Sequence, residues 1–448
     1  MLQSAANWLF GAAIALSLLA LVDAKPWPRA PASASYIDQY PSSTTPITLP
    51  VRSKSFNIVD YGAVGDNVTV NTAVFNKIVA LVAANGDGEI YIPPGIFVSG
   101  TFNLTSHVTL RLASGAVLAG SPNFADHEII PALPSYGRGR ETESIFRYSS
   151  LVHGENLDDV VITSDNGQGV IDGNGMGWWA AHRASNLTYT RGHLVELMYT
   201  TDIMLVNVEL RNSPFWTIHP YSSTNVLVSN VTINNPLDSP NTDGCDPDSC
   251  NQVVIQNCVF TVGDDCIAVK SGWDNPGIQY GVPTTDVVIR NMTMHTPTSA
   301  AIAIGSEMSG GVSNLLAQDI RAFNCSSGIR LKSARGRGGY LRNLTFDGVT
   351  LNDVKTALSI NDFYGQHESI FYDPLAVPII DSIFMSNIVG TAITIPGDFQ
   401  GLFDAKITNV AISNVSLAVV GSGSYTCSYA TGTQHAVVPV LCDAFARV

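Results

Sequence analysis

Charged side chains are scarce in this sequence, and basic ones are the scarcer. Only 13% of the 448 residues are charged, and 23 Lys and Arg stand against 37 Asp and Glu, which gives a formal net charge of -14. A surface this acidic repels nucleic acid and anionic membranes. We therefore expect neither as a partner, and an anionic ligand would need a local basic site.

Cysteine is absent from the first half of the chain. The seven cysteines are too few and too scattered to frame a small disulfide-rich domain, and their spacing does not match paired Cys-x-x-Cys zinc sites. We expect no metal and no cofactor, but local disulfides, with Cys427–Cys442 the best candidate. An odd number leaves one thiol free or bonded between chains. The cysteines are Cys245, Cys250, Cys258, Cys266, Cys325, Cys427 and Cys442.

An apolar run opens the chain. "MLQSAANWLFGAAIALSLLALVDA" ends in the small-residue pattern Val22-Asp23-Ala24, and its apolar part is short for a membrane span of roughly 20 residues. It predicts a signal peptide over residues 1–24 and a secreted protein; an uncleaved anchor is the alternative. Eight glycosylation sequons agree with secretion: Asn67, Asn103, Asn186, Asn230, Asn291, Asn324, Asn343 and Asn414.

The rest of the chain divides in two by composition. Residues 25–53 are rich in Pro and Ser, which predicts an extended leader. Residues 54–448 carry one repeating pattern and are expected to form a single domain. The helical spacing in "TAVFNKIVALVAAN" (72–85), with Val74, Ile78, Leu81 and Val82 on one face, predicts a helix that caps the N-terminal end of the repeats.

The repeat is a short strand, a corner at Asn, and a second short strand. Successive corners lie between 23 and 39 residues apart, so insertions interrupt the units. Asp319 and Gly348 take the corner position in "LLAQDIRA" and "LTFDGVTL". The other units are "IMLVNVEL" (203–210), "VLVSNVTI" (226–233), "VVIQNCVF" (253–260), "VVIRNMTM" (287–294), "IFMSNIVG" (383–390) and "VAISNVSL" (410–417).

These units predict an all-β solenoid. Their period of two and their Val, Ile and Thr content exclude helical repeats, and Asn, Asp and Gly tolerate the left-handed conformation that a corner needs. A parallel β-helix stacks such units roughly 4.8 Å apart. A propeller would need tight antiparallel hairpins, which the sequence does not show. A capped solenoid need not associate, so we expect a monomer.

Acidic and basic residues fall in equivalent loops of neighbouring units. Asp243 lies in "SPNTDGCD", Asp264 and Asp265 lie in "TVGDDCIAVK", and Arg330 and Lys332 lie in "GIRLKS". If the units stack, the three carboxylates share one face, and they cannot all ionise at ordinary pKa values. One protonated acid beside ionised carboxylates is what glycoside hydrolysis requires.

The basic residues form a local exception to the acidic composition. From residue 320 to 346 the chain has six Arg and Lys and no Asp or Glu. Arg330 and Lys332 are two positions apart, so they point to the same side of a strand. This segment predicts a binding site for carboxylate groups.

In combination, these motifs resemble family 28 of the glycoside hydrolases, the pectin-degrading polygalacturonases. The match runs from about residue 56 to the region of Asp362, and "PSYGRGRE" and "VKSGWD" look like the plant branch of probable polygalacturonases. The remaining motifs that carry it are "FNIVDYGAVGD" (56–66), "IDGNGMGWW" (171–179), "NTD" (241–243), "GDDCIA" (263–268), "GSEMSGGV" (305–312) and "GIRLK" (328–332).

The resemblance implies a right-handed parallel β-helix that hydrolyses α-1,4-galacturonan with inversion. It implies that Asp264 is the general acid and that Asp243 and Asp265 activate the water. Arg330 and Lys332 would hold a galacturonate carboxylate. The "GSEMSGG" run looks more like exo-acting than endo-acting members. Substrate contacts are also expected from Asn241, in "NTD", and from Lys270.

One departure from the family pattern stands out. The family usually has Gly-His-Gly before its "IGS" segment, and here Ser299-Ala300-Ala301 stand in that place. Either the histidine is dispensable, or another residue substitutes, or the protein binds pectin without cutting it. His219 and His295 are the nearby histidines, and a structural role is expected for both.

Three functions therefore remain open at this point. The retained Asp243, Asp264 and Asp265 favour a secreted pectin hydrolase. A non-catalytic pectin-binding wall protein is the alternative that the lost histidine suggests. A pectate lyase shares the fold but would use calcium, and the sequence has no dense acidic cage for that ion.

Overall fold

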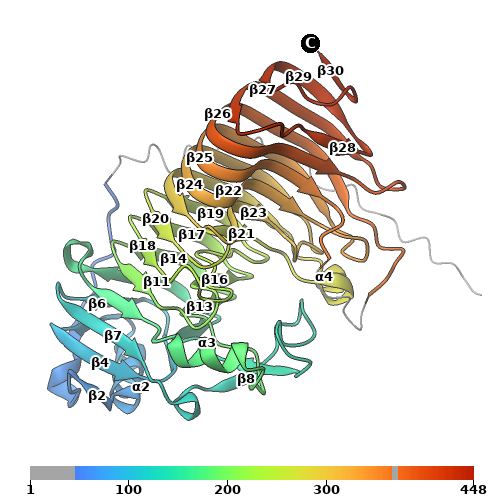
Figure 1. Ribbon diagram of the computed structural model, residues 1–448. Helices are drawn as coiled ribbons and strands as arrows, with labels where there is room; N and C mark the ends of the chain where they lie inside the picture. Colours follow the sequence, from blue (N-terminus) through green and yellow to red (C-terminus); the bar gives the residue numbers. More distant parts are fainter. Residues whose placement is uncertain (1–45, 366–371, 448) are drawn as a thin grey trace, which may run out of the picture.

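The chain winds into parallel rungs stacked along one axis. The computed structural model describes residues 46–365 and 372–447. Strands pair in parallel with the strand one turn later, from α2 (Thr72–Asn85) at one end to the C-terminus at the other (Figure 1). Within these residues one strand pair is antiparallel, β8 (Ile129–Pro131) with β9 (Phe146–Tyr148). The solenoid is confirmed, and the propeller is excluded.

Three parallel sheets form the sides of the coil. The first contains β1 (Ser55–Asn57), β3 (Gly88–Ile92), β6 (Val108–Leu112), β11 (Asp158–Ser164), β14 (Thr201–Val206), β17 (Thr224–Ser229), β19 (Asn251–Gln256) and the start of β22 (Thr284–His295). The second contains β2 (Asp66–Val70), β4 (Gly95–Ser99), β7 (Ala116–Gly120), β12 (Val170–Asp172), β15 (Glu209–Arg211), β18 (Thr232–Asn234), β20 (Val259–Thr261) and the end of β22.

The third sheet carries the candidate site. It contains β5 (Phe102–Asn103), β10 (Val152–Glu155), β13 (Val195–Met198), β16 (Ile218–Tyr221), β21 (Ile267–Val269) and β23 (Ala300–Ile304). Later strands turn the corners without a break: β24 (Val312–Lys332), β25 (Tyr340–Asn361) and β26 (Ile379–Gln400). The last rungs are β27 (Ile407–Val419), β28 (Thr426–Ser428), β29 (Ala430–Val438) and β30 (Phe445–Arg447).

Left-handed residues turn the chain from the first sheet to the second. All eight predicted corner positions have positive φ, from 51° at Asn291 to 67° at Gly348. Side chains then join neighbouring rungs, as where Asn291 Nδ2 donates to Asn257 Oδ1 at 2.7 Å. The corner positions read from the repeat are thus confirmed one by one.

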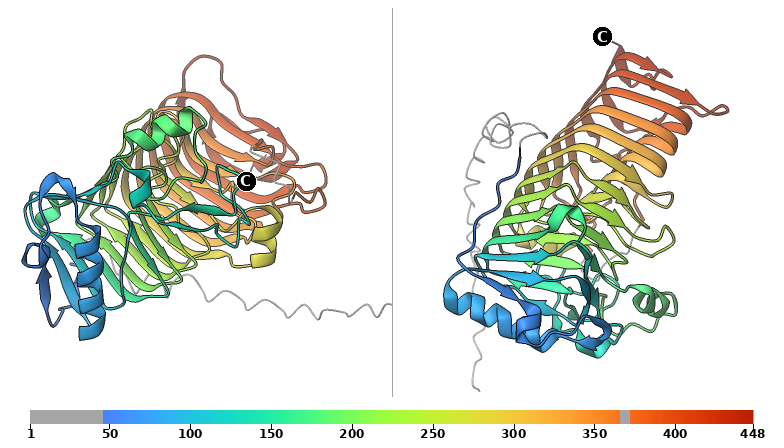
Figure 2. Two further views of the ribbon diagram at one scale, coloured as in Figure 1. Left: turned by 90° about the horizontal axis from the view of Figure 1, so that it is seen from below. Right: turned by 90° about the vertical axis from the view of Figure 1, so that its left-hand side faces the viewer.

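Inward-facing apolar residues fill the coil. Ile255, Ile289 and Ala317 occupy equivalent places on successive rungs and are fully buried. Because each rung covers the one below, such columns form one continuous core along the axis. The regular stack that results is plain in the side view of Figure 2.

Helix α2 closes the N-terminal end, as predicted (Figures 1 and 2). Ile78 and Val82 are buried, whereas Val74 and Leu81 are half-buried. Phe75, which the predicted face left out, is fully buried and stacks on Phe102 of β5 with the ring centroids 4.5 Å apart. The helix therefore turns the 75–78–82 row toward the first rung.

The first described residues of the N-terminal segment pack against the coil. Ile47 and Leu49 pack on the outer face of the first sheet against Leu227 and Val254. The predicted signal peptide, and the predicted leader as far as residue 45, lie outside the described residues. Across residues 46–365 and 372–447, no helix has the length and hydropathy to cross a membrane.

One disulfide joins Cys427 to Cys442 near the C-terminal end, which confirms that pairing. The prediction of one leftover thiol is wrong, because the other five cysteines are free and buried in the core. They lie in inward-facing places and serve as small apolar residues.

Candidate active site

The three aspartates lie where loops from the second sheet enter the third. Asp243 precedes a short bridge between β16 and β21, and Asp264 and Asp265 precede β21. The two loops touch, since the Gly244 N–H donates to the Asp265 carbonyl at 2.9 Å. One carboxylate oxygen from each aspartate lies within 4.8 Å of the others. The prediction that stacking brings them together is therefore met.

Gly263 permits this approach through its small size. A Cβ atom at Gly263 would lie 2.1 Å from the Ser239 carbonyl oxygen, on the loop that carries Asp243. Gly263 is not among the residues with positive φ. Its role is thus close contact between two backbones, and both Asp264 and Asp265 face the pocket.

Asp265 is held by four donors. Its Oδ1 accepts from Ser299 Oγ at 2.6 Å, from the Ala300 N–H at 2.9 Å and from Arg330 Nη2 at 2.7 Å. Its Oδ2 accepts from Lys332 Nζ at 2.6 Å. Arg330 and Lys332, predicted to bind a substrate carboxylate, thus pair with a carboxylate of the protein.

The environments of the aspartates separate their charge states. Burial acts to raise the pKa of Asp265, but Lys332 and Arg330 outweigh it and hold that pKa below its ordinary value. Burial, and then the charge of Asp265, raise the pKa of Asp264. The centre therefore keeps one carboxylate ionised beside a carboxyl that retains its proton into less acid solution.

Asp243 lies on the other side of this pair. Burial, and then the charges of Asp246 and Asp264, raise its pKa well above the ordinary range. Its Oδ2 is 3.9 Å from Lys270 Nζ. Its Oδ1 is buried and makes no hydrogen bond to the described residues.

Lys270 is tied to the opposite wall of the pocket. Its Nζ lies 3.1 Å from Glu307 Oε2 and 4.2 Å from the centroid of the Trp216 ring. Glu307 also accepts from Arg140 Nε at 2.6 Å. Both cations act against burial to keep the pKa of Glu307 well below its usual value. The predicted substrate contact at Lys270 thus belongs to a buried ionic chain.

Asn241 is fixed by a buried arginine. It has φ 55°, lines the pocket, and its Oδ1 accepts from Arg191 Nη2 at 2.9 Å. Arg191 Nε also donates to both carboxylate oxygens of Glu141, each at 3.1 Å. The first residue of the "NTD" motif is thereby coupled to a distant loop that carries Glu141.

That distant loop, residues 132–145 between β8 and β9, is called the closing loop below. Tyr136 packs against Met198 and Tyr221 on the outer face of β13 and β16, and its hydroxyl donates to Asp248 Oδ2 at 2.6 Å. The backbone N–H of Trp273, the residue just before α4 (Asp274–Tyr280), donates to the carbonyl of Ser135 at 2.9 Å. The closing loop therefore lies over β13 and β16 and reaches the segments that follow β21 and β23.

The result is a pocket of about 690 Å³. Residues 138–143 of the closing loop line one end together with His182 of α3 (Met176–Arg183), and Tyr364 and Thr298 also line it. All seven predicted site residues line it as well: Asn241, Asp243, Asp264, Asp265, Lys270, Arg330 and Lys332. The roles assigned to them remain predictions.

Ser299 stands at the place of the family histidine. Its hydroxyl donates to Asp265 Oδ1 at 2.6 Å and accepts from Arg330 Nη2 at 2.7 Å. Ala300 and Ala301 are buried. A serine therefore supplies a hydrogen bond to the carboxylate pair, but it has no group that titrates near neutral pH.

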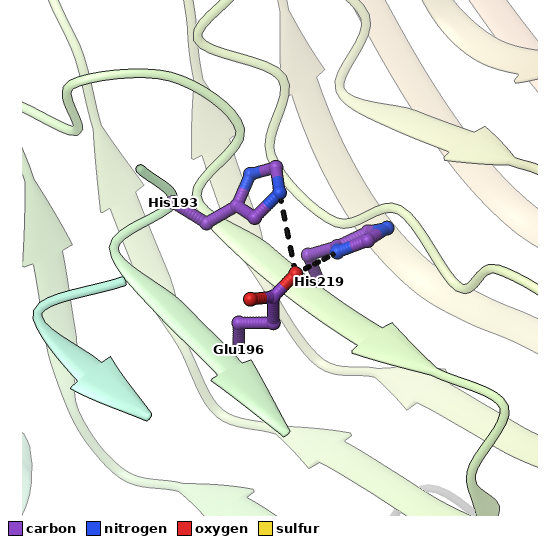
Figure 3. A group of neighbouring side chains, drawn as sticks. All are labelled: His193, Glu196 and His219. Carbon is purple, nitrogen blue, oxygen red and sulfur yellow. Dashed lines mark hydrogen bonds and ion pairs between the residues drawn. The ribbon is translucent and has the colours of Figure 1, made fainter. Parts of the chain in front are cut away.

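Neither nearby histidine replaces the missing one. His295 stacks on Phe323 on the outside of the coil. His219 is fully buried, and its Nδ1 lies 2.9 Å from Glu196 Oε1, with His193 at 3.4 Å from the same oxygen (Figure 3). The sequence reasoning missed His182, which lines the pocket and pairs with Glu141 at 2.8 Å.

Two groups of side chains have the donor types of a metal site. In the first, His193, Glu196 and His219, the second carboxylate oxygen of Glu196 accepts from Arg147 Nη1 at 2.8 Å. In the second, the three aspartates, Arg330 and Lys332 supply the positive charge. In each case a protein cation already holds one of the carboxylates, which fits ion pairing better than metal binding.

Comparison with known proteins agrees with this geometry. The family model "Glycosyl hydrolases family 28" matches residues 89–438. A probable polygalacturonase of Vitis vinifera is 43% identical over 398 residues, which cover 88% of this chain and 80% of that protein. A probable polygalacturonase of Arabidopsis thaliana is 28% identical over 379 residues, covering 83% of this chain and 75% of that one.

A solved structure extends the likeness to three dimensions. The exopolygalacturonase of Thermotoga maritima superposes with a TM-score of 0.75 at 25% identity, covering 89% of this chain and 95% of that one. The superposition confirms a right-handed parallel β-helix. From the family match, the relatives and the site, the chain belongs to glycosyl hydrolase family 28 and is a glycosidase.

Proposed function

We propose that this glycosidase hydrolyses α-1,4 linkages between galacturonate residues of pectin. The observation that carries the proposal is the ion pairing of Asp265 with Lys332 and Arg330 beside Asp264. It places an ionised carboxylate, a carboxyl that keeps its proton and two fixed cations in one pocket. The names of the relatives, polygalacturonase and exopolygalacturonase, support the same substrate.

The charge states support a division of labour among the aspartates. Asp264, whose pKa is raised by burial and by the charge of Asp265, holds its proton to higher pH than Asp265 does and gives it to the glycosidic oxygen. Asp265 remains ionised and takes the proton of the attacking water. Asp243, which lines the same pocket, is assigned to hold that water.

The basic side of the pocket supports recognition of a uronate. Arg330 is 19% exposed, so its guanidinium is the more accessible of the two cations next to Asp265. A carboxylate of the substrate can accept from it while Lys332 keeps Asp265 ionised. This chemistry selects acidic sugars over neutral ones, in a protein whose overall charge is negative.

The closing loop supports action at chain ends. It lies across the third sheet, and its residues 138–143 form part of the wall of the pocket. The ion pair between Arg140 and Glu307 fixes it to the opposite wall. A polymer that passed through the site would have to displace this loop, whereas a chain end would not.

The test is a reducing-end assay on polygalacturonate at mildly acid pH, with the products separated by chromatography. We expect galacturonate monomer from the wild type and a loss of about 10²–10⁴-fold in rate for Asp264→Asn, the range for a general acid. Asp238→Asn is the matched control, because Asp238 is an 86% exposed carboxyl on a neighbouring loop. Full activity of Asp264→Asn would refute the assignment of the acid.

The same assay separates the other functions. Binding of polygalacturonate with no release of reducing ends from the wild type would identify a pectin-binding protein. An unsaturated product, detected by its ultraviolet absorbance, would identify a lyase. Retention of all three aspartates in a pocket favours the hydrolase.

Secretion and monomeric state complete the proposal. Cleavage after Ala24 is supported by the apolar N-terminal segment of residues 1–24. Expression in a eukaryotic host should yield protein in the medium that begins at Lys25, and sedimentation should give a monomer. Retention in the cell membrane with an intact N-terminus would contradict the first expectation.

A further inference from the structure

A fourth carboxyl, Asp246, lies behind the three aspartates and has no part in the function proposed above. It follows Asp243 by three residues, in the segment that bridges β16 and β21. Its side chain is fully buried and does not line the pocket. Neither of its carboxylate oxygens makes a hydrogen bond within residues 46–365 and 372–447.

A carboxylate in that position would be costly. A buried ionised group without hydrogen bonds loses its hydration and receives little in exchange, so it tends to take up a proton. The negative charge of Asp265 lies close by and acts in the same direction. The geometry thus favours an uncharged Asp246 as long as protons are available.

The neighbours of Asp246 explain why its charge matters. The titratable groups that face it come from several elements: Lys270 after β21, His219 of β16, Asp243 of its own segment, Asp265 and Glu307. Lys270 is the cation that they share, with Nζ 3.1 Å from Glu307 and 3.9 Å from Asp243. An ionised Asp246 would compete for that ammonium group and would repel Asp243 and Asp265.

We propose that Asp246 is a positioning residue that acts in its uncharged form, leaving the charge of Lys270 to Glu307. When Asp246 ionises, its charge attracts Lys270 and acts on the aspartates in front of it. The inference rests on the proposed hydrolysis and adds to it a second group, besides the proton of Asp264, whose ionisation lowers activity on the alkaline side.

Asp246 ionises within the pH range over which activity can be measured. Burial raises the pKa of this carboxyl to about 7, against the opposing effects of Lys270 and His219. It is therefore uncharged in mildly acid solution and ionises near neutrality. An Asn side chain has nearly the same shape and remains uncharged at every pH.

The experiment compares wild type and Asp246→Asn from pH 4.5 to 8.5, by kcat on polygalacturonate and by thermal denaturation. We expect the variant to stay within about threefold of the wild type at pH 5, and its alkaline limb to move up by at least about half a pH unit. Asp246→Ser, which is also uncharged, carries the same test if the Asn variant does not fold.

Asp362→Asn is the matched control. Asp362 is another buried carboxyl, to which no side chain of the described residues donates a hydrogen bond, with a pKa also raised to about 7 by burial, and it is not among the groups that act on Asp243 or Lys270. We expect both Asn variants to flatten the fall of stability with pH, and only Asp246→Asn to shift the activity profile. A purely structural role for Asp246 would change stability alone.

The contrary results are distinct. A folded Asp246→Asn that loses more than about 100-fold in kcat at pH 5 would show that the charged form is needed. An alkaline limb unchanged from the wild type would also overturn the inference. A wild type without hydrolytic activity would instead refute the proposed function, and a denaturation profile unchanged in Asp246→Asn would then overturn the uncharged state of Asp246.

Discussion

Lys332 Nζ lies 2.6 Å from Asp265 Oδ2, and these side chains are only 7% and 1% exposed. The contact is a buried ion pair between two residues that line the same pocket and are 67 positions apart in the sequence. It keeps one of three crowded carboxylates ionised, and the division of charge in the site depends on it.

Lys332→Met should unfold more easily than the wild type by about 3–5 kcal/mol, because it leaves Asp265 buried without its closest cation. The pKa of Asp265 should rise, so the acid limb of the activity profile should move to higher pH. Denaturant unfolding and a kcat profile measure both effects. Arg335→Met is the control: its pair with Asp404 is exposed to solvent, so its loss should change stability little.

The anomer formed first is a second prediction. Oxygen atoms of the three carboxylates lie within 4.8 Å of one another, closer than the roughly 6.5–9.5 Å between the carboxyl groups of most inverting glycosidases. The four donors nevertheless hold the Asp265 carboxylate away from the bond-forming position of a nucleophile, whereas Oδ2, which accepts from Lys332 alone, keeps a lone pair for the proton of a water molecule. We expect inversion, seen by NMR as the β-anomer of galacturonate at early times; the α-anomer would refute it.

Shortening the closing loop tests its part in end recognition. Replacing residues 133–144 by a short Gly-containing turn between β8 and β9 should open the pocket at that end. Products should then change from monomer alone to a mixture of longer oligomers. Arg138→Gln, which keeps the loop length, is the control. Release of monomer alone by the shortened protein would show that the loop does not decide where the chain is cut.

Asp362 should make stability depend on pH. Burial raises its pKa to about 7, whereas an unfolded Asp titrates near pH 4. Between these values the folded state binds a proton that the unfolded state has lost, so stability falls as pH rises, by at most roughly 1.4 kcal/mol per pH unit. Asp362→Asn should remove that fall. Denaturant unfolding at pH 4.5, 6 and 7.5 measures the stability of both proteins. If Asp362 were charged throughout, the stability of the wild type and of Asp362→Asn would change equally with pH.

The disulfide should stabilise the last rungs only. Cys427 and Cys442 enclose a loop with a sequence separation of 15, for which chain entropy predicts a contribution of about 3 kcal/mol. In Cys442→Ser we expect faster hydrogen exchange in β28 to β30 and unchanged activity, since the aspartates lie several rungs away. Loss of activity would show that the C-terminal rungs support the site.

The fold and the identity of the acidic residues could be predicted because the solenoid repeats itself. Each Asn corner marks a rung, and the loop positions counted from the corners bring Asp243 and Asp264 together without any knowledge of long-range contacts. The same counting identified Arg330 and Lys332. It failed to show that these cations are paired with Asp265. The strand register predicts which residues lie on adjacent rungs, but it does not predict which side chains bind each other.

What the repeat could not predict comes from the insertions. Arg140 meets Glu307 across 167 positions, and nothing in an irregular loop indicates which wall of the pocket it will reach. The substitution of Ser299 for a histidine was visible, but its hydrogen bond to Asp265 depended on the path of one short loop. The free cysteines were misjudged because a buried thiol and half of a disulfide look alike in a sequence.

The closing loop has a consequence for how a long polymer is consumed. If the closing loop blocks one end of the pocket, as proposed, a monomer released there would lie between the loop and the shortened chain and would leave only after the chain withdraws. Every cut would then be followed by dissociation, and chains in a mixture would shorten together. The protein would trim all available ends evenly, and it would not erode one polymer completely before starting on the next.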